Sequence, residues 1–193
     1  MRVWSVQPLE LYEKLKRDGV LHCDIELSEC AGERAILAAY DWMCEQMRNR
    51  IELPPKGARY PFWAWHTVDW KHKKPDLRRR EFRNRCRPAV CLELEIPENQ
   101  ILLSDMENWH VVLNDGFFCC SNSQADYDRV NAWFEALPPD RQQDAKLKSW
   151  ENIFDITPAA TDWLIKGRYI QATFWELNLN QIVSVRHFCQ NSH

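Results

Sequence analysis

The sequence predicts a single α+β domain, residues 1–193, with a split sheet that is rich in antiparallel strands. Helical patterns cluster in the first quarter and the third quarter of the chain, whereas strand patterns lie at its start, middle and end. This order lacks the repeating strand–helix–strand alternation of a parallel α/β fold. The chain has the length of one domain, and 45% of its residues are hydrophobic, which suffices for a sizeable core.

The first quarter is predicted to hold a strand, a helix, a short extended return and a longer helix. Residues 2–7 are β-rich, and Pro8 suits the first turn of a helix that ends at Gly19. Residues 20–21 return as an extended segment. The longer helix is predicted over residues 33–50, because its apolar side chains recur at three- and four-residue spacing: Ile36, Tyr40, Met43, Met47 and Ile51.

Two strands are predicted in the middle of the chain. One lies within residues 59–68 and places Trp63 and Trp65 on the same face. The other covers residues 89–96, with alternate apolar side chains on one face and Cys91, Glu93 and Glu95 on the other. A pair of carboxylates on one strand can serve acid–base chemistry, but a solvated strand face is the favoured interpretation of Glu93 and Glu95.

The second half is predicted to contain three helices and two closing strands. Ser104 and Glu107 have the spacing of a capping box, Ser123 caps a helix through residue 137, and a further helix starts at residues 138–140. Residues 169–177 and 182–188 form the last two strands. Among the ten tryptophans, Trp70 should be the most exposed, and five should be largely buried: Trp42, Trp109, Trp133, Trp163 and Trp175.

Residues 71–88 are predicted to form a basic loop. Residues 71–87 hold nine Lys and Arg against two acidic residues, so their net charge is 9 − 2 = +7, while the remaining chain carries −3 − 7 = −10. Clustered cations attract an anionic partner, and phosphates are the expected anions. Candidate phosphate ligands are Lys71, Lys73, Lys74, Arg78, Arg79, Arg80, Arg83 and Arg85. A solvated loop without a partner is the alternative that the charge pattern leaves open.

Several familiar sites are absent from the sequence. It contains no Walker A loop, dinucleotide fingerprint, nucleophile elbow or zinc-protease helix. The eight cysteines lack the paired spacing of zinc ligands, so no metal is expected and the thiols are predicted to be mostly reduced and buried. No apolar run approaches the length of a membrane span, and the first residues lack a signal-peptide pattern, so we expect a cytoplasmic protein.

Four segments carry a resemblance that covers nearly the whole chain: residues 2–8, 60–65, 91–97 and 171–177. They resemble a prokaryotic family catalogued as domain of unknown function 3841, which implies no activity. The order of elements also resembles the ADP-ribosyltransferase fold, including the DarT-type toxins. In that group, a first-strand Arg or His helps to hold NAD, and a Glu on the penultimate strand supports cleavage of the nicotinamide bond.

The second resemblance implies NAD as a cofactor and a cleft between the first and penultimate strands. Ser5 stands where the group has Arg or His, and Thr173 stands where it has Glu. Gln171 and Glu176 are therefore the catalytic candidates that the resemblance implies. It likewise implies these cofactor-binding residues: Trp4, Ser5, Trp65 and His66.

Two functions follow, and both fit the charge distribution. The first is an NAD- or nucleotide-using transferase of the ADP-ribosyltransferase type that acts on an anionic or nucleic-acid-associated target. The second is a non-catalytic module that binds nucleic acid or another polyanion through the basic loop, with Trp63, Trp65 and Trp70 as stacking faces. An enzyme predicts a pocket with convergent polar groups, whereas a binding module predicts a basic surface whose affinity depends strongly on salt.

Overall fold

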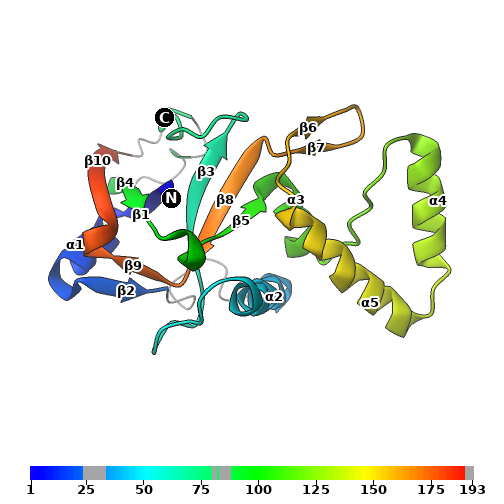
Figure 1. Cartoon of the computed structure of the whole chain (residues 1–193), viewed down its shortest axis with the longest axis horizontal. Coiled ribbons are helices and arrows are strands. Elements are labelled where there is room, and N and C mark those ends of the chain that lie inside the picture. The colour runs from blue at the N-terminus through cyan, green and yellow to red at the C-terminus, as the bar shows by residue number, and fades with distance from the viewer. Residues whose placement is uncertain (24–33, 80–81, 83–87, 190–193) are drawn as a thin grey trace.

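A central antiparallel sheet organises the molecule (Figure 1). The computed structural model describes residues 1–23, 34–79, 82 and 88–189. Among these residues, six strands form the sheet, in the spatial order β10 (Ile182–Cys189), β4 (Pro88–Glu95), β1 (Arg2–Pro8), β3 (Phe62–Val68), β8 (Tyr169–Phe174) and β5 (Leu102–Asp105). Each neighbouring pair runs antiparallel. The α+β class and the antiparallel character predicted from the sequence are confirmed.

Two small sheets and several helices surround this sheet. Strand β2 (Val20–His22) pairs with β9 (Glu176–Asn178), and β6 (Ala159–Ala160) pairs with β7 (Ile165–Lys166). The α-helices are α1 (Leu9–Asp18), α2 (Arg34–Arg50), α3 (Met106–Leu113), α4 (Gln124–Glu135) and α5 (Pro139–Trp150). Short 3₁₀ helices are η3 (Glu98–Gln100), η4 (Glu151–Phe154) and η5 (Leu179–Gln181).

One face of the sheet packs on α1 and the β2–β9 pair. The alternation in β4 predicted this face, since Val90, Leu92 and Leu94 are all buried in one core cluster with Leu15 of α1 and Leu177 of β9. Burying each such aliphatic side chain contributes about 1.5–3 kcal/mol. The predicted helix before Gly19 is confirmed as well: Gly19 has φ of +77°, and its N–H donates to the Leu15 carbonyl.

The opposite face of the sheet packs on α2 and α3 in the part that contains β3 and β5. Met43 and Met47 of α2 are completely buried beside Trp109 of α3. Trp63 of β3 joins this cluster, and its ring centroid lies 5.2 Å from that of Trp109. Burial of Trp42, Trp109 and Trp175 was predicted correctly.

The predicted strand over residues 169–177 is two strands, so this prediction was wrong. Strand β8 ends at Phe174, and β9 begins at Glu176 in a different sheet, paired with β2. Trp175 lies between them, buried, with its indole N–H donating to the Glu52 carbonyl at 2.9 Å. Anchoring this indole on the segment after α2 turns the chain away from the central sheet.

The start of α3 also differs from the prediction. Asp105 is the N-cap, because its carboxylate accepts the Asn108 N–H at 2.9 Å, whereas Ser104 is a buried residue of β5. The second carboxylate oxygen of Asp105 accepts the N–H of Gly167 at 2.6 Å. The Asp105 carboxylate satisfies an N–H group of the helix start, and unlike a hydroxyl it also places a negative charge at the positive end of the helix dipole.

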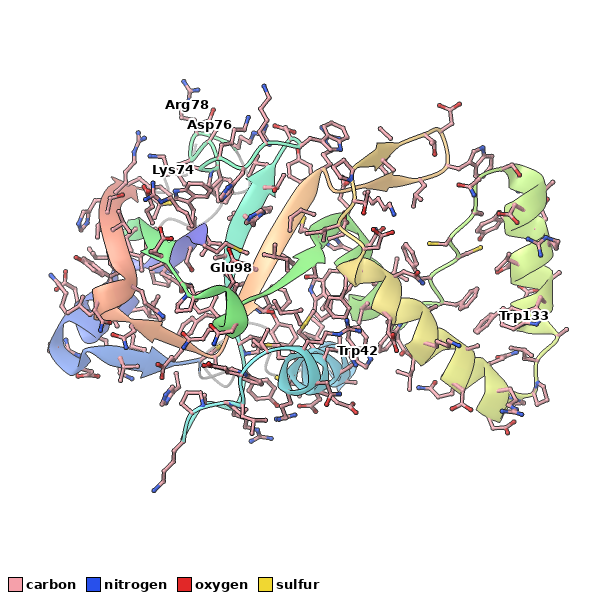
Figure 2. All side chains as sticks on the ribbon, viewed as in Figure 1. Trp42, Lys74, Asp76, Arg78, Glu98 and Trp133 are labelled. Atoms are coloured by element: carbon pink, nitrogen blue, oxygen red, sulfur yellow. The ribbon has the colours of Figure 1, made fainter. Side chains whose placement is uncertain are left out.

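Helices α4 and α5 form an arm that extends away from the sheet (Figure 1). Ser123 caps α4 as predicted, through its Oγ and the Asp126 N–H. No residue of α4 is buried, and Trp133, near the C-terminal end of this helix, is 53% exposed (Figure 2). The predicted burial of Trp133 and Trp163 was therefore wrong, because the elements that carry them lie off the two main cores. Both are more exposed than Trp70, which was predicted to be the most exposed.

Candidate polyanion-binding surface

The basic loop, residues 71–88, connects β3 to β4, and its described residues include two that pack on the sheet. Leu77 and Phe82 are 6% and 7% exposed and are buried against Trp4 and Cys91. Phe82 also meets Trp65 edge to face, with ring centroids 5.9 Å apart. The charge pattern of this loop predicted only that it is basic, and these two apolar side chains nevertheless join a buried cluster. They fix the described part of the loop to the sheet face.

A strained two-residue turn leads into this loop. Val68 and Lys71 exchange two backbone hydrogen bonds, with N···O distances of 2.9 and 3.2 Å. The two residues between them, Asp69 and Trp70, have φ of +51° and +57°. Glycine and asparagine usually occupy such positions in hairpin turns, because a left-handed backbone costs other residues about 1–2 kcal/mol each. The surrounding contacts must therefore hold this turn in place.

We call the contacts around the Asp69 carboxylate the Asp69 clamp: Asp69, Arg79, Arg168 and Tyr169. The Tyr169 hydroxyl donates to one carboxylate oxygen at 2.7 Å, and Arg79 Nη2 contacts the other at 2.5 Å. Arg168 Nε lies 3.5 Å from the first oxygen. The hydrogen bonds from Tyr169 and Arg79 lower the pKa of Asp69. The clamp thereby ties the turn, the start of β8 and the middle of the basic loop together.

Three lysines of the loop present their charges to solvent. Lys71, Lys73 and Lys74 are exposed and form no ion pair with any residue of the described ranges. Figure 2 shows Lys74 near Asp76 and Arg78 on the loop beyond the end of β3. These ammonium groups are free to contact an anion, whereas their backbone is held by the turn and by Leu77.

The arginines of the loop divide into two kinds. The Arg78 side chain is 80% exposed and pairs with Asp76 two residues earlier, with Nη2 and Oδ2 2.8 Å apart. Arg79 belongs to the Asp69 clamp, so its guanidinium already has a carboxylate partner. Arg80, Arg83 and Arg85, also predicted to contact phosphate, lie outside the described residues. Among the described candidates, the lysines are therefore the unpaired cations.

Two histidines stack beside the turn. The rings of His66 and His72 have centroids 4.2 Å apart and an interplanar angle of 17°. His72 Nε2 donates to the Arg2 carbonyl at 2.7 Å, and His66 Nδ1 lies 2.9 Å from the Thr67 hydroxyl. Burial, and then the neighbouring His72, lower the pKa of His66 to about 4. At neutral pH, His66 is thus uncharged and offers no ion pair to a phosphate.

Three residues that the ADP-ribosyltransferase resemblance implied lie in one row across the sheet. Trp4 of β1 is opposite Trp65 of β3, which is opposite Gln171 of β8. Gln171 Nε2 donates to the Ser104 Oγ at 3.4 Å on the next strand. Ser5 points to the opposite face of the sheet, buried, with its hydroxyl donating to the Trp63 carbonyl. The structure therefore brings Trp4, Trp65 and Gln171 together and separates Ser5 from them.

Glu176 lies in a different place, on the small β2–β9 sheet. It lines a pocket whose other walls include Glu52, Trp175 and Gln181. The Glu176 carboxylate is 3.6 Å from the ring of His22 on the paired strand β2. Because the chain leaves the central sheet at Trp175, Gln171 and Glu176 do not face one common site.

The other carboxylates considered from the sequence are paired with cations. Glu93 and Glu95 both contact Arg2 Nε, at 3.3 and 3.5 Å, and Glu95 also meets the terminal amine of Met1. Glu93 accepts a further hydrogen bond from Ser184. These contacts support the interpretation of this pair as a solvated, charge-balanced strand face.

Sequence reasoning missed the residues that hold the surface together. Asp69 lies about a hundred positions before Arg168 and Tyr169 in the chain, and only strand pairing brings Val68 opposite Tyr169. The apolar Leu77 and Phe82, placed within a charged run, were the available signal. Apolar residues inside a polar loop indicate segments that pack on a core.

The described ranges contain no group of three or more His, Cys, Asp or Glu side chains that could hold a metal ion. Within the same ranges, no helix has both the length and the apolar character needed to cross a membrane.

No curated protein matches this chain, and no solved structure does. The model of one family matches residues 2–183, nearly the entire sequence. The chain therefore belongs to the family described as domain of unknown function DUF3841.

Proposed function

We propose that this protein binds a polyanion of the nucleic-acid type through the basic loop. One observation carries the proposal: Lys71, Lys73 and Lys74 are exposed and unpaired on a loop whose backbone is already anchored. Anchored cations lose less conformational freedom on binding than cations on a disordered segment. Their spacing of one to three residues also suits contact with successive charges along a chain-like anion.

The proposal predicts a specific salt dependence. Each phosphate that a lysine neutralises releases counterions, with a slope of about −0.7 to −0.9 in log affinity against log salt. Three lysines correspond to a slope of about −2 to −3. Affinity should then fall roughly 20- to 40-fold between 50 and 200 mM salt.

A charge-matched pair of variants tests the proposal. The first variant replaces Lys71, Lys73 and Lys74 with Ala, and the control replaces three exposed lysines elsewhere, Lys14, Lys56 and Lys148. Both lose the same net charge. Binding of a labelled oligonucleotide, measured by anisotropy at several salt concentrations, should weaken and lose most of its salt slope only in the loop variant. Equal effects of the two variants would mean that net charge, rather than this loop, attracts the polyanion.

A second candidate is an NAD- or nucleotide-using transferase of the ADP-ribosyltransferase type, with the corresponding fold. The pocket beside Glu176 supports it, since Glu52 and Glu176 both line this pocket together with Trp175. The residues of the central row fit a dinucleotide less well. Leu77 and Phe82 cover Trp4 and Trp65, and NAD could use this face only if the loop moved.

The transferase is tested separately from polyanion binding. If the second candidate is correct, NAD binds saturably, and nicotinamide is released on incubation. Glu176→Gln should then abolish the release while leaving binding nearly intact, because a carboxylate's charge acts mainly on the developing positive charge of the transition state. Gln171→Ala is the comparison on the central sheet and should leave the release unchanged. Nicotinamide release that survives in Glu176→Gln would refute the role of this pocket.

A further inference from the structure

Trp70 lies at the surface in a backbone conformation that is unfavourable for a tryptophan. Its φ of +57° lies in the left-handed region, and the residue is 43% exposed. In the left-handed region a bulky residue has a strained backbone, and an exposed tryptophan gains little of the stabilisation that burial normally provides. Strain of this kind persists where the surrounding structure enforces it, and it is concentrated at functional positions.

The neighbours of Trp70 fix the orientation of its indole. The backbone N–H of Trp70 donates to the backbone carbonyl of Arg168 at 3.0 Å, which fixes the main chain from which the indole projects. The Arg168 guanidinium lies over the ring, 5.2 Å from its centroid, and is 3.5 Å from the Asp69 carboxylate. The Asp69 clamp therefore holds one side of the indole, while almost half of the residue stays open to solvent.

The other two tryptophans near the basic loop are engaged in packing. Trp63 contacts Trp109 in the core beneath α2 and α3. Trp65 meets Phe82 and Tyr169 edge to face, with centroids 5.9 and 6.4 Å away. Of the three stacking faces expected from the sequence, Trp70 is the one that the structure presents beside the free lysines.

We propose that Trp70 is a stacking platform for an unpaired base, and that the polyanion is a single-stranded nucleic acid. The indole would contact one base while Lys71 and Lys73 contact the flanking phosphates. Lys71 and Lys73 are one and three residues from Trp70, and three residues of extended chain span at most about 11 Å, which keeps these cations close to the base that rests on Trp70. This inference rests on the proposed polyanion binding and adds the aromatic part of the ligand.

An unpaired base is the ligand that uses this arrangement fully. Stacking on an aromatic side chain favours every base, since each has a π-face, and the arginine below the indole adds to the interaction. Bases in a duplex are already stacked on their neighbours and are not available to Trp70. A sulfated polysaccharide has the charges but lacks aromatic rings.

The test uses a substitution that should relieve strain. Trp70→Gly removes the ring at a position where glycine is favoured, so the protein should fold at least as well as the parent. Trp133→Ala is the matched control, since Trp133 is 53% exposed on the distant arm. The probes are a labelled single-stranded oligonucleotide, the same length of abasic strand, a duplex and dextran sulfate.

Trp70→Gly should weaken binding of the single strand about 5- to 150-fold and leave binding of the abasic strand and dextran sulfate unchanged. Trp133→Ala should leave the binding of all these probes unchanged. The parent protein should also bind the single strand more tightly than the duplex. Equal loss for all four probes would show that Trp70 acts only by shaping the loop and would overturn the inference.

The possible failures are distinguishable. If the parent binds every polyanion and Trp70→Gly binds them equally well, the base platform is wrong while polyanion binding stands, and Trp70 belongs to some other contact such as one with a protein. If the parent binds none of the probes, the proposed function itself has failed.

Discussion

Replacement of Asp69 with Asn should loosen the basic loop without unfolding the protein. Asparagine tolerates the left-handed backbone and can still accept the Tyr169 hydroxyl, so the change removes mainly the charge opposite Arg79 and Arg168. Hydrogen bonds to charged groups contribute about 1.5–3 kcal/mol when buried, and exposed ion pairs contribute about 0.2–1 kcal/mol. Asp69 and Arg79 are 28% and 36% exposed. An intermediate loss of about 1–2 kcal/mol follows.

Thermal and urea unfolding measure this loss. For a protein of this size, about 1–2 kcal/mol corresponds to a fall in Tm of roughly 2–8 °C. Asp76→Asn is the matched control, because Asp76 pairs with the 80%-exposed Arg78 on the same loop, and its loss should leave the stability almost unchanged. Trypsin should also cut within residues 71–79 faster in Asp69→Asn. Indistinguishable stability and cleavage in the two variants would refute the idea that Asp69 anchors the loop.

The pH dependence supplies an independent check on the same carboxylate. The pKa of Asp69 is lowered in the folded protein, so its charge stabilises the fold fully at pH values above the unfolded pKa of about 3.9. This contribution is lost as the pH falls through the lower, folded pKa. The stability difference between the parent and Asp69→Asn should therefore be constant from about pH 5 to pH 7 and shrink below about pH 4.

Two further predictions concern buried titratable groups. The pKa of His66 is about 4 in the folded protein, below the ordinary value of about 6.5, so stability should fall as the pH drops from 6.5 towards 4. Unfolding of His66→Gln should lack part of that fall, and NMR titration should show a neutral His66 at pH 5.5. Burial raises the pKa of Cys44 to about 12 and that of Cys91 to about 11. Iodoacetamide should therefore modify the exposed Cys120 before either of them in the native protein, as mass mapping would reveal.

Local sequence patterns predicted the elements that bury one continuous face. Strand β4 and helix α2 were located within a residue or two of their ends, because period 2 and the three- and four-residue spacing report directly which side chains enter a core. The chain of elements from β1 to β2 was predicted for the same reason, aided by Pro8 and Gly19 at the helix ends.

Predictions failed where the outcome depended on distant partners. Residues 169–177 have the composition of one strand, but the Trp175 indole binds the Glu52 carbonyl and the strand divides there. Trp133 was predicted to be buried, yet no residue of α4 is buried and Trp133 is 53% exposed. Hydrophobic spacing indicates that a face can be buried and does not specify whether another element covers it.

The candidate site divides in the same way. The excess of Lys and Arg between β3 and β4 is a local property, so the sequence alone determined that this loop is basic, and it predicts an anionic partner. Tertiary structure decided which cations are free. Arg79 forms an ion pair with Asp69, whereas Lys71, Lys73 and Lys74 form no ion pair among the described residues. Tertiary structure also decided which of the three tryptophans near this loop is exposed, since the Asp69 clamp beside Trp70 depends on the pairing of β3 with β8, strands about a hundred residues apart in the chain.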